Sequence, residues 1–358
     1  MNFSNITKDS IPSDLIQPRR GQIYVGFKCH QRCGFCYYKS KCDDEMFDFD
    51  YVKKQIDFEY EYGIRDFEIT GGEPSEYVFL PEVCDYIRNK DPNSKIAIIT
   101  NGGLWNKPVW DKIDEVLVSY HLSKSPAVIN KYMFPLGTTY YKVLRTVGSA
   151  YSNNVLLRTN TVLGSFNLYD IKNIVSDLIS FKPRIINFLP VNIFDGAKGM
   201  SSYIDYTNLR DVIKTQIDRI KNELPDTLVF IRYMPFCDME GYEQHIIGHL
   251  QHIYDWFDWN RELDGIGVLN MLDKNPRDIL GRYGSKSVDV CFEQRTGLYE
   301  KNINCMMCKY NIICDGVERT GGELFNQIVP SRGKIITNPM EFIGDTTYRL
   351  YSDIYGKR

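Results

Sequence analysis

Several features that mark common protein classes are missing from this 358-residue chain. No apolar run reaches about 18 residues, so the sequence predicts no membrane-spanning helix. Residues 1–20 are polar and lack the apolar stretch of a secretory signal, which favours a cytoplasmic protein. Basic residues do not exceed acidic ones: 43 Lys and Arg stand against 46 Asp and Glu, for a formal net charge of -3. A nucleic-acid partner is therefore not expected, because such proteins carry a basic footprint.

Long low-complexity linkers and internal repeats are also missing. Hydrophobic residues make up 43% of the chain and aromatic residues 13%, which is enough for a sizeable core. A chain of this length allows one large α/β domain with a smaller one. We divide it into an N-terminal extension (1–20), a core domain (21–225), a second domain (226–329) and a tail (330–358).

Strand-like and helix-like segments alternate from about residue 21 onward. Short apolar runs predict strands at residues 22–27, 67–70, 95–100, 115–119, 155–160, 185–189 and 228–234. Helical spacing predicts helices at residues 49–62, 82–90, 139–152, 167–181 and 208–223. Such repeated units are typical of a parallel sheet with right-handed crossovers. In these sheets ligands bind beyond the carboxyl ends of the strands.

Six of the ten cysteines fall in two tight clusters: Cys29, Cys33 and Cys36, and Cys305, Cys308 and Cys314. Such clustering in a chain without an export signal indicates metal ligation rather than disulfides. Three thiolates close together can bind three irons of a cubane and leave the fourth iron open to a bound molecule. A zinc knuckle is the alternative, although a knuckle normally has its fourth ligand nearby.

The first cluster, C-x3-C-x2-C with Phe35 before its last cysteine, resembles the radical S-adenosylmethionine (radical SAM) superfamily. Three later segments match the family in order, namely Ile69–Pro74 (Ile-Thr-Gly-Gly-Glu-Pro), Ile99–Gly103 and Val118–His121. The resemblance covers residues 20–235 and implies an α/β fold, a partial (β/α)6 TIM-like barrel. It also implies that the three cysteines hold a [4Fe-4S] cluster whose open iron chelates the amine and carboxylate of SAM.

The resemblance further implies that residues after the strands bind SAM: Phe35, Gly71, Gly72, Glu73, Asn101, Ser119 and His121. Within this set, Phe35 would lie near the adenine and Glu73 would bind the methionine ammonium. Arg158 and Asn160 are weaker candidates, because the family's fifth-strand motif is poorly matched here. The alternative for each residue is an ordinary polar or packed position at a strand end.

The second cluster, C-x2-C-x5-C, resembles the C-terminal auxiliary cluster domains of many radical SAM enzymes, of the SPASM or twitch kind. The chain lacks the cysteine that the full SPASM pattern has soon after Cys314, so we predict one auxiliary [4Fe-4S] cluster and two clusters in all. Cys237 is the predicted fourth ligand, with Cys291 as its competitor. A zinc site is the alternative here too.

Three of the five histidines, His245, His249 and His252, are spaced so that a helix within residues 241–259 would place them on one face. Such a face could bind substrate, transfer protons or hold zinc. The favoured alternative is a packed or solvated polar face.

The resemblance implies an enzyme that cleaves SAM reductively to a 5′-deoxyadenosyl radical, which abstracts a hydrogen atom from a substrate. We favour a small metabolite that undergoes dehydrogenation, epimerisation or rearrangement, and an electron donor such as flavodoxin or ferredoxin. A maturase of ribosomal peptides is the alternative, less favoured because Cys29 leaves no room for an N-terminal leader-binding domain. A non-catalytic iron–sulfur electron carrier or redox sensor is a further alternative, although it would not need Glu73.

Overall fold

A computed structural model gives the structure of this chain. It describes residues 6–12, 19–36, 38, 42, 44–122, 140–191, 206–257, 262–263, 292, 295–318, 328–343 and 346–356. One sheet of nine strands dominates this part of the chain, in the order β8-β7-β6-β5-β4-β3-β2-β1-β9. All its strand pairs are parallel.

The strands of this sheet are β1 (Arg20–Tyr24), β2 (Asp66–Thr70), β3 (Lys95–Thr100), β4 (Glu115–Ser119), β5 (Leu156–Leu163), β6 (Ile185–Pro190), β7 (Leu228–Arg232), β8 (Ile246–Ile247) and β9 (Glu262–Leu263). Because β1 to β8 follow one another in chain order, every crossover moves one strand further in the same direction, as in the wall of a barrel. In the described residues β8 and β9 each pair with one neighbour, so the sheet stays open.

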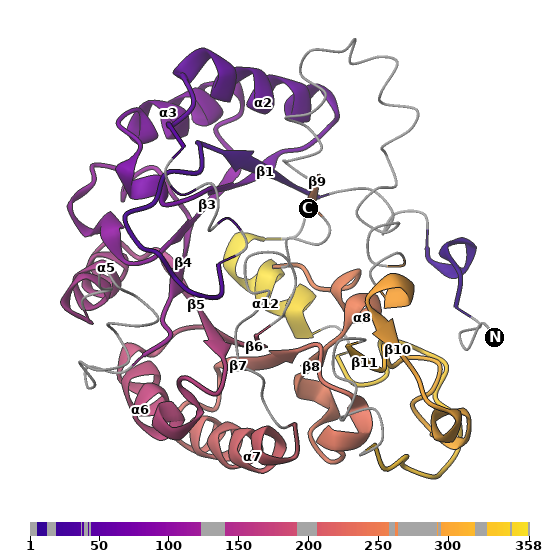
Figure 1. The fold of residues 1–358 in the computed structure, drawn as a ribbon. Helices are drawn as coiled ribbons and strands as arrows, with labels where there is room; N and C mark the ends of the chain where they lie inside the picture. The colour runs from indigo at the N-terminus through magenta and orange to yellow at the C-terminus, as the bar shows by residue number, and fades with distance from the viewer. Residues whose placement is uncertain are drawn as a thin grey trace.

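The outer side of the curved sheet is covered by α2 (Phe49–Glu61), α3 (Leu80–Lys90), α5 (Tyr140–Ser152), α6 (Ile171–Phe181) and α7 (Tyr206–Glu223) (Figure 1). Strand residues are buried on both faces, as a parallel sheet between two layers requires. Local sequence starts the helices: Asp48 caps α2 by accepting a hydrogen bond from the backbone N–H of Tyr51 at 2.8 Å. The predicted α/β fold with a partial barrel is confirmed.

The histidine segment is the clearest departure from the predicted elements. A helix through His245, His249 and His252 is wrong, because this stretch forms η8 (Glu243–His245), β8 and α8 (His249–His252) in succession. Ile246 and Ile247 pair with β7 instead of continuing a helix, as β-branched residues at a sheet edge favour. All three histidines are buried, so the prediction of a packed polar position is nearer to the structure.

Buried charges fill the barrel at the amino ends of the strands. Arg20 binds both carboxylate oxygens of Glu115, at 3.0 and 3.2 Å, and Arg158 contacts Glu115 at 3.1 Å and Glu68 at 2.7 Å. Burial opposes ionisation of Glu115, but Arg20 and Arg158 lower its pKa to about 2. Arg158 therefore belongs to this ionic layer and is not at the carboxyl ends of the strands, where SAM was expected.

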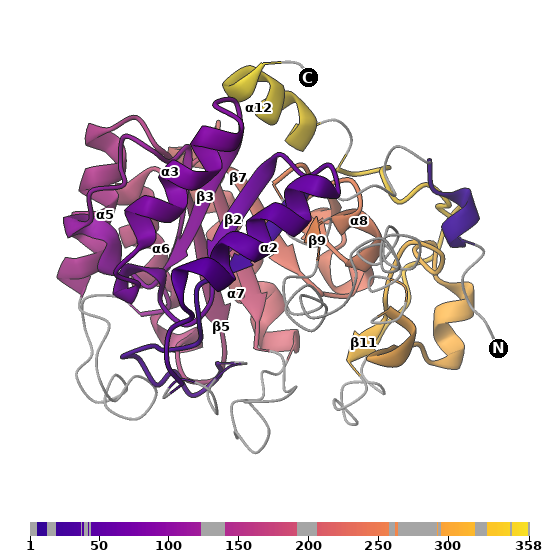
Figure 2. The same cartoon turned by 90° about the horizontal axis from the view of Figure 1, so that it is seen from above.

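The predicted tail contains α12 (Thr346–Tyr355), which covers the amino ends of the strands (Figure 2). The hydroxyl of Tyr351 donates to Asp66 and that of Tyr355 donates to Glu115, both at 2.9 Å. These bonds attach α12 to the ionic layer. No helix in the described part of the chain combines the length and apolar character needed to cross a membrane.

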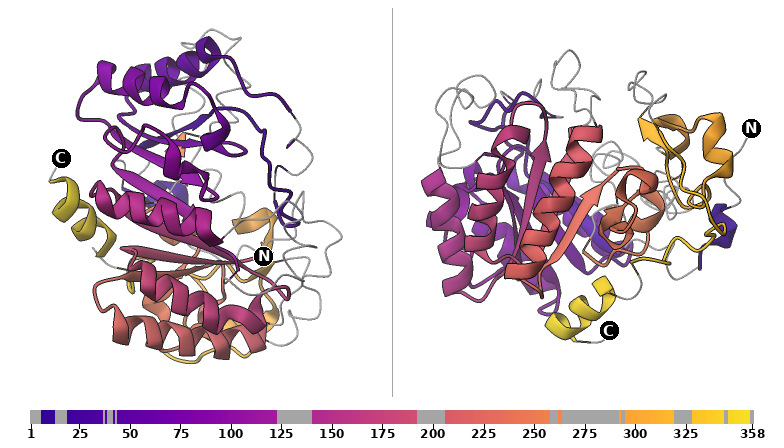
Figure 3. Two further views of the ribbon diagram at one scale, coloured as in Figure 1. Left: turned by 90° about the vertical axis from the view of Figure 1, so that its left-hand side faces the viewer. Right: turned by 90° about the horizontal axis from the view of Figure 1, so that it is seen from below.

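The second cysteine cluster lies in a small irregular unit beside α8 (Figure 3). Here β10 (Tyr299–Glu300) pairs antiparallel with β11 (Val317–Glu318), and η10 (Ile303–Met307) carries Cys305. Strands β7 and β8 continue the main sheet past residue 226. The boundary between the two domains stays a prediction.

Candidate functional site

A cavity of about 270 Å³ opens at the carboxyl ends of the central strands. It is lined by all ten residues that were predicted for the first cluster and for SAM: Cys29, Cys33, Phe35, Cys36, Gly71, Gly72, Glu73, Asn101, Ser119 and His121. They come from the loop after β1 and from the ends of β2, β3 and β4. Their individual roles stay predictions, but the fold places them around one space.

Close backbone packing holds the cysteine loop against the end of β2. The N–H of Gly72 donates to the carbonyl of Gly26 at 2.9 Å, and that of Glu73 donates to the carbonyl of Lys28 at 3.0 Å. A Cβ atom on Gly72 would lie 2.1 Å from the Lys28 oxygen, and Gly71 has a φ of +139°. The two glycines therefore allow the cysteine loop to approach the backbone, and their contact with SAM stays a prediction.

We expect Gly72→Ala to displace the cysteine loop, because its methyl group would overlap backbone oxygens that cannot rotate away. The expected result is destabilisation of about 1–3 kcal/mol and loss of most iron from the first site, measured by iron analysis after anaerobic reconstitution. Gly148→Ala on α5 is the matched control, since a Cβ atom added to Gly148 would have no other atom within 4 Å. Full iron content in Gly72→Ala would contradict this account.

Glu73 connects the ends of β2 and β3. Its Oε1 accepts from the hydroxyl of Thr100 at 2.6 Å and from the N–H of Ser75 at 3.1 Å, and its Oε2 accepts from the N–H of Asn101 at 2.7 Å. Burial raises the pKa of Glu73 above 4.5, against the opposing effect of these hydrogen bonds. The side-chain hydroxyl of Ser75 is a further hydrogen-bond partner, so the carboxylate is held by Ser75, Thr100 and Asn101 together.

Three polar side-chain atoms in the cavity wall are buried without a hydrogen-bond partner: Asn101 Oδ1, Asn160 Oδ1 and Gln31 Nε2. Buried polar groups in native proteins are nearly always paired, so such atoms call for a ligand or water. Two acceptors and one donor suit the ammonium, ribose hydroxyls and carboxylate of SAM. Asn160, given little weight from the sequence, therefore fits the site as well as Asn101 does.

The three thiols of the loop lie in surroundings that disfavour their charged form. Burial raises the pKa of Cys29 to about 12 and raises that of Cys33 well above its ordinary value. A bound cation reverses this preference, because a coordinated thiol is deprotonated. Asn101 Nδ2 lies 3.9 Å from Cys29 Sγ and can donate to it. The donor set therefore fits an iron–sulfur cluster.

His121 and Phe35 form another part of the cavity wall. Burial lowers the pKa of His121 to about 3, so its ring is neutral at pH 7. Its Nδ1 accepts from the N–H of Val162 at 3.0 Å, which places the ring proton on Nε2. Phe35 contacts His121 edge-on, with ring centroids 4.9 Å apart, and stacks on Phe166 at 5.5 Å. Phe35 is thus packed and also lines the cavity.

Tyr233 is a cavity residue that was not predicted from the sequence. It follows β7 directly and has a φ of +64°, which is rare for a bulky side chain and typical of functional sites. Its ring stacks on His249 with centroids 4.7 Å apart. An aromatic residue at a strand end is the sequence signal that could have indicated it.

The second cysteine set also comes together. Cys237, Cys305, Cys308 and Cys314 line one small pocket with Lys301 and Asn311. The thiols of Cys237 and Cys308 are hydrogen-bonded, which raises the pKa of Cys237 and lowers that of Cys308 to about 6. The N–H of Gly316 donates to Cys314 Sγ at 3.3 Å. Four thiols and a sulfur-directed N–H suit an iron–sulfur cluster. The competitor Cys291 lies outside the described residues.

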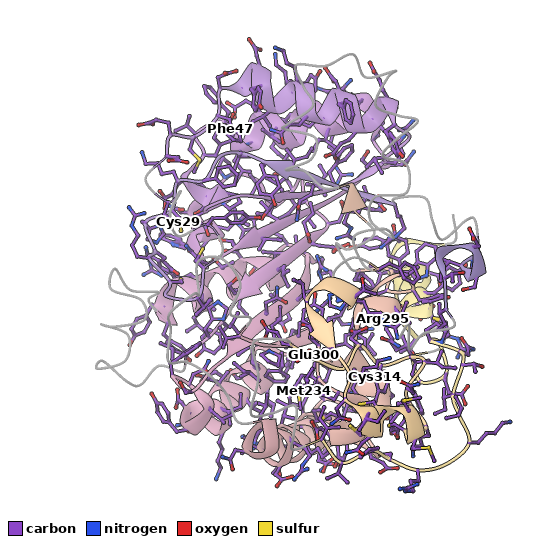
Figure 4. The ribbon with its side chains drawn as sticks, turned by 45° about the vertical axis from the view of Figure 1, so that its right-hand side comes forward. Cys29, Phe47, Met234, Arg295, Glu300 and Cys314 are labelled. Carbon is purple, nitrogen blue, oxygen red and sulfur yellow. The ribbon has the colours of Figure 1, made fainter. Side chains whose placement is uncertain are left out.

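The two cysteine sets lie in separate regions of the molecule, as Cys29 and Cys314 show in Figure 4. Beside the second set, His249 Nδ1 contacts Asp315 Oδ2 at 3.0 Å, and Arg295 donates to the Cys314 carbonyl at 2.9 Å. Throughout the described residues, no three Cys, His, Asp or Glu side chains are arranged for a single metal ion. The buried histidines therefore form no zinc site there.

Comparisons with known proteins identify what part of this chain resembles. Residues 23–175 match the family model described as the radical SAM superfamily. A curated "S-adenosylmethionine-dependent nucleotide dehydratase" of Thermoplasmatales archaeon (strain ISO4-H5) is 33% identical over 86 residues, which are 24% of this chain and 30% of that protein. A "GTP 3',8-cyclase" of Clostridium perfringens (strain SM101 / Type A) is 26% identical over 258 residues, 67% of this chain and 75% of that protein. The first of these relatives is thus matched over less than a third of its length.

Among solved structures, that of Streptococcus suis SuiB bound to precursor peptide SuiA is similar with a TM-score of 0.56 at 14% identity. The similarity covers 85% of this chain and 75% of that one, and it concerns the fold. The matched sequence segment contains the cysteine loop and the ends of β2, β3 and β4 that surround the cavity. Residues 23–175 are therefore a radical SAM domain.

Proposed function

We propose that this enzyme cleaves SAM reductively and uses the resulting radical to abstract a hydrogen atom from a small-molecule substrate. One observation carries the proposal: three loop cysteines and the SAM-binding candidates of three further strand ends line the same cavity. When bound, the reduced cluster would supply the electron that splits SAM into methionine and a 5′-deoxyadenosyl radical. The chain's own residues bind and orient the cofactor.

The buried polar atoms suggest how SAM is held. Cys29, Cys33 and Cys36 would ligate three irons as thiolates. The carboxylate of Glu73 and the unpartnered Oδ1 of Asn101 would accept from the ammonium. Ser119 and the Nε2–H of His121 would contact the ribose or carboxylate, with Asn160 beside them. Phe35 would contact the adenine from the wall that it shares with His121.

We also propose one auxiliary [4Fe-4S] cluster on Cys237, Cys305, Cys308 and Cys314. Their meeting in one pocket supports it, because Cys237 is far from the other three in sequence. Removing two hydrogens from a substrate leaves an electron to be accepted after the first abstraction. An auxiliary cluster would accept that electron, which favours a dehydrogenation among the reactions considered.

The substrate class rests on the relatives. Both reported curated relatives have names that refer to nucleotides, and this supports a nucleotide-like metabolite as the substrate. A peptide is the second candidate, because the structure of SuiB, which was solved with a precursor peptide, has a similar fold. Incubation with nucleoside triphosphates would distinguish the two candidates. Faster formation of 5′-deoxyadenosine would support a nucleotide-like substrate, and an unchanged rate would favour a peptide.

Iron and labile sulfide per chain, with 5′-deoxyadenosine formation, test the proposal on anaerobically reconstituted protein. We expect about eight irons per chain and SAM cleavage under dithionite, since two cubanes hold four irons each. About four irons per chain together with SAM cleavage would support the radical SAM site and contradict the auxiliary cluster. Absence of cleavage in iron-loaded protein would contradict the proposed reaction.

A further inference from the structure

Exposed apolar side chains gather around the second cysteine set. Among the described residues, twelve large apolar side chains are exposed, and five of them lie between residues 303 and 335: Ile303, Met306, Met307, Val329 and Ile335. We call these five the methionine patch. Single exposed apolar residues are common, but a concentration of them marks an interaction site. Ile303 is 73% exposed and Met307 is 62% exposed.

Two chain segments combine to form this surface. The N–H of Lys309 donates to the carbonyl of Ser331 and the N–H of Ile336 donates to that of Lys309, both at 2.8 Å. Ile328 packs on Cys305 and Cys237. Hydrogen bonds and packing therefore connect the segments that carry the methionine patch to the pocket of four cysteines.

The charge around the methionine patch is opposite to that of the whole chain. Residues 295–318 and 328–336 contain five basic and three acidic side chains, whereas the complete chain has a formal net charge of -3. Arg332 and Lys334 are exposed at its rim, and Lys309 is paired with Glu240. A positive rim around an apolar centre attracts an acidic protein and repels a second copy of itself.

Two cysteines of the second set keep a small exposed fraction. Cys305 and Cys308 are 8% and 5% exposed, and they flank the exposed Met306 and Met307 in the sequence. Methionine side chains adapt to varied partner surfaces, which suits brief encounters. Transient redox complexes typically bury less than about 1,200 Å², an area that a patch of this kind can supply.

We propose that the methionine patch docks a small acidic protein that carries a one-electron redox centre. This inference rests on the proposed auxiliary cluster. In the complex, the reduced cysteine-bound cluster loses the electron that it accepted from the substrate, the oxidised carrier gains it, and no covalent bond or proton is exchanged. The surface thus lets this electron leave the enzyme at the second cysteine set, away from the SAM cavity.

The test measures binding of oxidised flavodoxin, an acidic one-electron carrier, to the reconstituted enzyme by calorimetry at low and high salt. We expect a micromolar Kd that weakens with salt. Met307→Glu and the double variant Arg332→Glu/Lys334→Glu should each weaken binding at least about tenfold. Leu144→Glu on α5 and Lys172→Glu on α6, both at exposed positions, are the controls and should bind as the parent does.

Three other results would each overturn a different part of this inference. Equal Kd values for the parent and the patch variants, with about eight irons per chain, would refute the docking surface alone. About four irons per chain would refute the auxiliary cluster and with it the electron transfer. Self-association of the parent that Met307→Glu abolishes would assign the surface to a second copy of the chain instead.

Discussion

Cys33→Ala is expected to abolish formation of 5′-deoxyadenosine from SAM. Cys33 lies in the wall of the cavity with Cys29 and Cys36, and two thiolates cannot replace three in holding a cluster with one open iron. The first site should therefore lose its iron, and about four irons per chain should remain on the second set. The measurements are iron content, the yield of 5′-deoxyadenosine, and circular dichroism to show that the fold persists.

Cys84→Ala is the matched control for this variant. Cys84 is fully buried on α3, and burial raises the pKa of its thiol to about 12, as expected for a packed, inert cysteine. Its loss should cost about 1 kcal/mol of stability and leave SAM cleavage unchanged. Cleavage retained by Cys33→Ala would show that the cluster is held elsewhere.

The second large effect is expected for Cys308→Ala and, equally, for Cys237→Ala. Both residues line the second pocket, and their thiols are hydrogen-bonded to each other, so each variant removes one of four ligands. We expect iron to fall from about eight to about four per chain while SAM cleavage without substrate continues. Substrate turnover should be lost, because the electron acceptor is gone.

Cys237→Ala is the more informative of the two variants. Cys237 was selected over Cys291 as the fourth ligand, and iron analysis of Cys291→Ala gives the comparison. Full iron in Cys237→Ala together with a loss in Cys291→Ala would reverse the assignment. Full iron in both variants would mean that a non-cysteine ligand completes the second set.

The core of the fold could be predicted because its strands are short apolar runs separated by helices. The strands at 95–100 and 115–119 have the predicted bounds, since charged or polar residues end each run. The histidine segment could not be predicted, because its pairing with β7 depends on a tertiary contact. The helix α12 was missed for a similar reason: its partners Asp66 and Glu115 are far away in sequence.

The site was predicted as a set of residues but not as a set of contacts. Gly71 and Gly72 line the cavity, where their contact with a ligand stays a prediction, and the structure adds that both pack against the cysteine loop. Glu73 was expected to bind an ammonium, and it also connects β2 to β3. Tyr233 and the unpartnered Asn160 depend on the curvature of the sheet, which brings the ends of β5 and β7 to the same cavity.

The hydrogen bond between Tyr355 and Glu115 has a consequence for the order of events during translation. The two residues are separated by 240 positions. At about 5–20 residues per second, a ribosome needs roughly 10–50 seconds to add the second after the first. Throughout that interval Glu115 and its arginine partners lack the helix α12, which covers them in the complete fold. The end of the barrel opposite the cysteines is therefore completed late, after nearly all of the chain has been made.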